Sequence, residues 1–105
     1  MATTNRILKA RVERGAALLD AKQPGWAPRI DVPSLDISSG KFCILGQVYE
    51  PGVHPNGYAA ALHALNGTAF LDTHAHGFNY VNAGDHARLL PLWREAIEAR
   101  CGGVA

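Results

Sequence analysis

The fold class of this protein depends on residues 42–49, whose sequence is FCILGQVY. On an α-helix the larger apolar side chains of this segment would share one face: Phe42, Leu45, Val48 and Tyr49. The same aromatic and β-branched content also suits a buried strand. A serine just before it, Ser38 or Ser39, can cap a helix, and no partner strand is evident elsewhere. We therefore predict a mainly α fold with long irregular loops, and keep an α+β fold with a strand at 42–49 as the alternative.

Three other segments have helical periodicity. Residues 4–22 carry apolar side chains three to five positions apart, and Thr4 can cap their start. Residues 58–66 are rich in helix formers, and residues 86–100 form an amphipathic pattern that Asp85 can cap. Pro91 is expected in the first turn of that last helix or just after a short preceding turn. Prolines exclude a central strand from residues 27–37, for which we predict an extended loop that places single apolar side chains in the core.

One small core is expected from these patterns. Its predicted members come from every segment except residues 58–66: Leu8, Val12, Leu19, Trp26, Ile30, Leu45, Trp93 and Ile97. Cys43 stands among apolar neighbours and is also expected in the core, because a free cysteine is among the most buried residue types. Gly15 lies inside the first predicted helix, where it favours a close packing contact.

Length and composition limit the classes of protein to consider. The chain has 105 residues, of which 48% are hydrophobic, as in one globular domain that spans residues 1–105. We expect order from about residue 4 to residue 100 and a frayed tail at 101–105. The two cysteines, the absence of an apolar leader and the absence of a long apolar run favour the reducing cytoplasm and no membrane contact.

Charge is unevenly distributed along a chain whose net charge is +1. The first 30 residues contain six basic and two acidic side chains, and the remainder contains four basic and seven acidic ones. The basic side chains of the first predicted helix are candidates for contacts with a partner: Arg6, Lys9, Arg11 and Arg14. A protein partner or, as an alternative, weak salt-dependent binding of nucleic acid would use them.

Residues 72–76, with the sequence DTHAH, resemble a metal-binding motif of amidohydrolases. Two histidines two positions apart on a strand point the same way and can hold one divalent ion, here His74 and His76, with Asp72, His63 or His86 as a third ligand. Such hydrolases are built on barrels of about 200 residues or more, which this chain cannot form. Gly77 and its polar neighbours also favour a loop. A small metal-binding protein or metal-dependent hydrolase remains an alternative, while no resident cofactor and no catalytic residue are predicted.

Several short motifs occur in a characteristic order over residues 12–99. They are RGAALLD at 14–20, PGW at 24–26, RID at 29–31, LDI at 35–37, CILGQVY at 43–49, HGFN at 76–79 and LWREAI at 92–97. This pattern resembles a group of small uncharacterised proteins of actinobacteria and their bacteriophages. The resemblance implies a structural role for the Gly-Phe element at 77–78. In that group a Cys-x-x-Cys is frequent, but Gly40 stands at its first position here, so no thiolate pair is available.

The size, the balanced charge, the lack of a catalytic constellation and this resemblance together favour a non-enzymatic protein. We expect it to act by binding a host protein, as a phage protein that modulates host physiology would.

Overall fold

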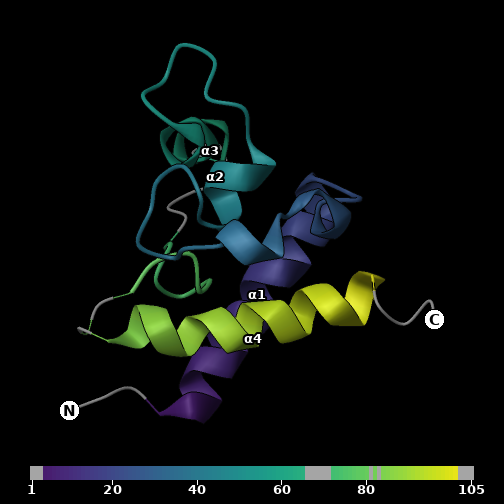
Figure 1. The fold of residues 1–105 in the computed structure, drawn as a ribbon, viewed down its shortest axis with the longest axis vertical. Coiled ribbons are helices and arrows are strands. Elements are labelled where there is room, and N and C mark those ends of the chain that lie inside the picture. The colour runs from purple at the N-terminus through teal and green to yellow at the C-terminus, as the bar shows by residue number, and fades with distance from the viewer. Residues whose placement is uncertain (1–3, 66–71, 81, 83, 102–105) are drawn as a thin grey trace.

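Four α-helices and two short 3-10 helices make up the described part of the computed structural model, residues 4–65, 72–80, 82 and 84–101. In chain order they are α1 (Asn5–Lys22), η1 (Ala27–Arg29), η2 (Val32–Ser34), α2 (Ile44–Val48), α3 (Gly57–Leu65) and α4 (Asp85–Cys101). The two longest helices, α1 and α4, cross one another, and α2 lies beside α3 toward one end of the molecule (Figure 1). No strand occurs in these residue ranges, so the prediction of a mainly α fold is confirmed and the α+β alternative is wrong.

Helix α1 begins where the sequence predicts it. The side-chain oxygen of Thr4 accepts a hydrogen bond from the backbone nitrogen of Ile7 at 3.4 Å, which satisfies one of the free N–H groups of the first turn. One face of the helix is buried, and its members recur at helical spacing: Leu8, Val12, Gly15, Ala16 and Leu19. This face is the surface on which α4 and the segment after residue 72 pack.

Helix α2 is shorter than predicted, and a cysteine rather than a serine caps it. The Cys43 sulfur accepts a hydrogen bond from the Gly46 nitrogen at 3.3 Å. Ser39 instead accepts from the backbone nitrogens of Lys41 and Phe42, and so closes the turn before the helix. Burial raises the pKa of the Cys43 thiol, which keeps it protonated and unreactive in its predicted place in the core.

The contact between α2 and α3 is one of backbone against backbone. A Cβ atom at Gly57 would lie 2.3 Å from the Gly46 carbonyl oxygen, and a Cβ atom at Gly46 would lie 2.4 Å from the Gly40 carbonyl oxygen. Real Cβ atoms do not approach so closely. Gly57 therefore allows α3 to approach α2 closely, and Gly46 allows the turn at residues 40–41 to fold back against α2.

Helix α4 runs from Asp85 to Cys101 and contains Pro91 in its interior, so both predicted places for this proline are wrong. A proline there has no N–H to donate to the Ala87 carbonyl. The apolar spacing continues across it, with Leu89, Leu92 and Trp93 all buried. Packing of this continuous face against α1 outweighs the lost hydrogen bond. Asp85, predicted as the cap, is the first residue of the helix.

The core is built around aromatic rings from separate parts of the chain. Trp26 meets Trp93 edge to face at a centroid distance of 5.9 Å, and Phe78 stacks on Trp93 at 5.6 Å. His76 in turn stacks on Phe78 at 6.1 Å. All eight apolar residues predicted for the core are buried: Leu8, Val12, Leu19, Trp26, Ile30, Leu45, Trp93 and Ile97.

The connections contain more regular structure than an extended loop. Between residues 27 and 37 the chain makes two 3-10 turns, yet it places single apolar side chains in the core as predicted: Ile30, Leu35 and Ile37 are buried, and Val32 is half-buried against that core. Cys101, which we assigned to a frayed tail, ends α4 and is half-buried against the core. The predicted fraying at 102–105 lies outside the described residues. No helix among the described residues is both long and apolar enough to span a membrane.

Candidate functional site

The predicted metal motif forms a capped helical turn, not a strand. The Asp72 carboxylate accepts hydrogen bonds from the backbone nitrogens of His74 and Ala75 at 3.0 and 3.1 Å, as a helix N-cap does. At the other end Gly77 has a φ of +70°, its nitrogen bonds to the His74 carbonyl, and the Phe78 nitrogen bonds to the Thr73 carbonyl. This is the Schellman pattern that ends a helix. Residues 72–78 are called the capped turn below.

The two histidines of this turn do not converge as they would on a strand. Positions two apart on a helical turn are separated by about 200° around the axis. The His76 ring is held by its Nδ1, 2.8 Å from the Asp72 carbonyl oxygen, while His74 Nδ1 lies 3.7 Å from the Asp72 carboxylate. The histidine, cysteine, aspartate and glutamate side chains of the described residues form no group of three that could hold a metal ion.

Metal content is the direct check of the metal hypothesis. We expect protein purified without chelator to contain less than about a tenth of an equivalent of zinc, nickel, manganese or iron, because a divalent ion needs several convergent ligands. Elemental analysis measures this, with a His74→Ala/His76→Ala double variant as the control for background. A stoichiometric metal in the wild type that disappears from the double variant would contradict the structural interpretation of this turn.

The capped turn is docked on α1. Arg14 Nε donates to the Ala75 carbonyl oxygen at 3.0 Å, and Trp93 Nε1 donates to the Gly77 carbonyl oxygen at 2.7 Å in a buried position. Gly15 provides the contact surface, since a Cβ atom there would lie 2.0 Å from the His76 carbonyl oxygen. The motif that suggests metal chemistry in the sequence therefore connects α1 to α4.

The predicted basic face of α1 is partly used inside the molecule. Arg14 bonds to the capped turn, and Lys9 Nζ lies 3.6 Å from the Glu95 carboxylate on α4. Arg6 is exposed and Arg11 is half-buried. The four side chains thus do not form one free basic surface, and acidic groups stand directly beside them.

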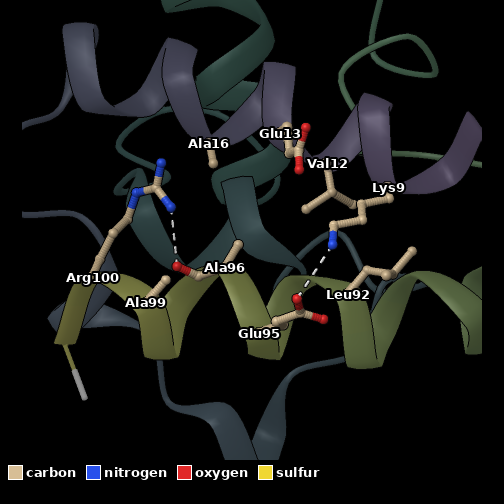
Figure 2. A pocket seen from close by; sticks show the side chains of 9 residues that line it. All are labelled: Lys9, Val12, Glu13, Ala16, Leu92, Glu95, Ala96, Ala99 and Arg100. Atoms are coloured by element: carbon tan, nitrogen blue, oxygen red, sulfur yellow. Dashed lines mark hydrogen bonds and ion pairs between the residues drawn. The ribbon is translucent and has the colours of Figure 1, made fainter. Parts of the chain in front are cut away.

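A hollow opens where α1 and α4 cross, and its lining includes Lys9 (Figure 2). Its volume is about 220 Å³. The residues that line it come only from these two helices: Lys9, Val12, Glu13, Ala16, Leu92, Glu95, Ala96, Ala99 and Arg100. The apolar members are short or buried, while the four charged members stand around them (Figure 2). We call this feature the α1–α4 hollow.

Two ion pairs between the helices lie at this hollow. Lys9 pairs with Glu95, and Arg100 binds Asp20 through two nitrogens, at 2.9 Å from Nε to Oδ1 and 2.8 Å from Nη2 to Oδ2. Asp20 also accepts from Trp26 Nε1 at 2.9 Å. The Arg100 hydrogen bond is the largest cause of a lowered Asp20 pKa, which burial opposes and the Trp26 bond reinforces.

Replacing Asp20 by Asn is expected to lower the free energy of unfolding by about 1 kcal/mol at neutral pH, a small value because the pair is partly exposed. The ordinary pKa of an aspartate carboxyl group is 3.8. A carboxyl group whose pKa is lowered in the folded state stabilises that state at pH values above 3.8, and this contribution is lost as the pH falls below 3.8. Urea denaturation at several pH values should therefore show the difference between wild type and Asp20→Asn shrinking in acid. A difference that stays constant, or one equally large for the exposed control Glu98→Gln, would contradict this role.

A second, larger hollow of about 510 Å³ lies beside Phe42, which is 42% exposed. Its lining comes from η2, the turn at residues 41–42, α2 and the segment that leads into α3. The Gln47 side chain crosses part of it, because its amide binds the backbone of both Asp31 and Phe42. We call this feature the Phe42 hollow.

The sequence did not reveal the α4 side of the α1–α4 hollow. Its residues recur at helical spacing, with Leu92, Ala96 and Arg100 four apart and Glu95 and Ala99 four apart. Ala96 and Ala99, which lie beside the apolar positions of α4, were a usable signal that this face of the helix is shallow. Where this face lies against α1 depends on how the two helices cross.

A comparison with protein-family models, curated proteins and solved structures finds no match to this chain.

Proposed function

We propose that this protein is a non-enzymatic binding protein that contacts a host protein through the α1–α4 hollow. The observation that carries the proposal is the hollow itself, which has an apolar floor and charged side chains around it. Interfaces between proteins are organised in this way, with a buried apolar anchor at the centre and a polar rim.

The size of the hollow favours a side chain of a partner over a small molecule. Sites for cofactors and other small molecules usually enclose about 300–1,000 Å³. The α1–α4 hollow has about 220 Å³, which is below that range. A single bulky side chain on a protein surface needs less space, and such anchors contribute much of the binding energy at interfaces.

The groups that could carry chemistry support a non-enzymatic role. The Cys43 thiol is buried, and its raised pKa disfavours the reactive thiolate. The Asp72 carboxylate is used as a cap by the backbone of the capped turn, and His76 bonds to the same residue.

The charges around the hollow favour a protein over a nucleic acid. Glu13 and Glu95 stand beside Lys9, so a phosphate backbone would meet negative charge at this surface. Nucleic-acid binding depends on several free cations in a row. The resemblance to small actinobacterial and bacteriophage proteins supports a partner in the cytoplasm of the bacterial host, whose physiology this protein would modulate.

Capture of a partner with matched variants tests the proposal. Wild-type protein immobilised and exposed to actinobacterial lysate is expected to retain one dominant protein. Ala99→Arg places a long side chain at the hollow and is expected to reduce that capture at least about tenfold, as loss of a central anchor does. Ala17→Arg makes the same change at an exposed site of α1 that does not line the hollow, and is expected to retain the partner.

The readout is the amount of the dominant protein in repeated captures, measured by quantitative mass spectrometry. Equal recovery by the two arginine variants would place binding elsewhere and overturn the assignment to the hollow. Background proteins alone, in every repeat, would overturn the proposed function.

A further inference from the structure

The α1–α4 hollow is lined by two basic and two acidic side chains, and three of these four have an ion-pair partner. The Lys9 ammonium is paired with the Glu95 carboxylate, and the Arg100 guanidinium is paired with the Asp20 carboxylate. Glu13 also lines the hollow, is exposed, and has no ion pair with any described residue. Glu13 is therefore the one charged side chain of the lining without an ion pair among the described residues, and it comes from α1 in the segment where the sequence is basic.

The floor of the α1–α4 hollow is apolar, which determines the kind of side chain that can occupy it. Val12 and Leu92 are buried, and the alanines at 16, 96 and 99 end at Cβ, which leaves the space between the helices. The side chains of this floor carry no hydrogen-bonding group. The polar groups at the hollow are the charged side chains of its rim, of which Arg100 donates from Nη1 to the Ala96 carbonyl oxygen at 3.1 Å (Figure 2). A polar group placed there would lose its water without gaining a hydrogen bond, whereas an apolar group would gain contact area.

From these two observations we infer that the occupant is a bulky apolar side chain, on a partner segment that carries Lys or Arg beside it. This inference rests on the proposed function and specifies the partner. The apolar anchor fills the hollow and supplies affinity, while the basic neighbour meets the Glu13 carboxylate. A charge at the rim of an interface contributes more to selectivity than to affinity.

A second copy of this chain is the alternative occupant that the test must distinguish. Phe42 is exposed, and the Lys41 ammonium lies 5.5 Å from the centre of its ring. Phe42 with Lys41 beside it is a bulky apolar side chain next to a basic one, which is the combination inferred for the occupant of the hollow. Because the Phe42 surface and the α1–α4 hollow are different surfaces, such a contact would be head to tail and would build rings or filaments instead of a closed dimer.

Selection from a random library of displayed peptides tests the inference whatever the identity of the partner. The target is the intact protein, and Ala99→Arg serves as the blocked control. Wild-type protein is expected to enrich peptides with Leu, Phe or Trp beside Lys or Arg. Against Glu13→Lys the same basic peptides are expected to bind about fivefold more weakly, and peptides with Asp or Glu at that position should be enriched instead. Glu98→Lys makes the same charge change on α4 outside the hollow, and should keep the basic preference.

The outcomes separate the inference from the proposed function. Apolar peptides that bind the wild type and not Ala99→Arg, without any basic preference or without reversal in Glu13→Lys, would overturn the inference and leave the proposed function standing. No enrichment over Ala99→Arg would overturn both. Sedimentation that shows self-association abolished by Phe42→Ala and by Ala99→Arg would identify the second copy as the occupant and overturn the inference.

Discussion

Replacing Gly15 by Ala is expected to lower the free energy of unfolding by about 2–3 kcal/mol. At an exposed position inside a helix this change would stabilise the protein by about 1 kcal/mol, because alanine is the better helix former. Here the new methyl group would lie 2.0 Å from the His76 carbonyl oxygen and 3.0 Å from the Trp93 ring. Neither neighbour is the flexible end of a side chain. The capped turn must move away from α1, which weakens the contacts that it makes there.

Urea denaturation followed by circular dichroism measures this effect. Ala17→Gly is the matched control, since Ala17 is exposed on the same helix. That variant should lose only about 1 kcal/mol from the reduced helix propensity. The sign of the change decides the question, because a Gly15→Ala protein more stable than the wild type would show that the capped turn does not pack against this glycine.

Replacing Trp93 by Phe is expected to cost about 3 kcal/mol, which combines a cavity with an unsatisfied buried carbonyl. The Trp93 side chain is fully buried, and its Nε1 donates to the Gly77 carbonyl oxygen at 2.7 Å in a buried position. Phenylalanine keeps an aromatic ring beside Phe78 but has no donor. Because Gly77 is buried, the hydrogen bond that its carbonyl loses is not replaced.

The second tryptophan of the core supplies the control. Trp26 is also buried, but its Nε1 donates to the partly exposed carboxylate of Asp20, which water can reach. Trp26→Phe should therefore cost about 1 kcal/mol less than Trp93→Phe in the same urea titration. Equal losses for the two variants would contradict a structural role for the Gly77 carbonyl in joining the capped turn to α4.

The helices were predictable because their signals are local. Thr4 as a cap and the recurring apolar positions of α1 indicate both its start and its buried face. The cap of α2 was not predictable, because the sulfur of Cys43 is a weaker acceptor than the serine oxygens that precede it. The position of Pro91 inside α4 was also not predictable from local rules. Local rules exclude proline from a helix interior, while the apolar face that continues on both sides packs against α1.

The capped turn illustrates a pattern that two structures can share. The spacing of residues 72–76 suits a metal-binding strand, but Asp72 five positions before Gly77 equally suits a short helical turn with both ends capped. The polar, glycine-containing surroundings favoured a loop, and that interpretation agrees with the structure. The alanines of α4 signal one side of the α1–α4 hollow, but no local pattern predicts the whole hollow, because it exists only once residues about 80 positions apart are brought together by the helix crossing.

The most direct test of the central claim is carboxyl footprinting of the protein with its captured partner. Carbodiimide labelling followed by mass spectrometry reports the exposure of each carboxylate. Glu13 reports on the α1–α4 hollow, Glu50 on the surface near the Phe42 hollow, and Glu98 on the part of α4 outside the α1–α4 hollow. If the partner occupies the α1–α4 hollow, labelling of Glu13 should fall severalfold in the complex, while labelling of Glu50 and Glu98 should not change. Unchanged labelling of Glu13, with protection of Glu50 near the Phe42 hollow instead, would contradict the account.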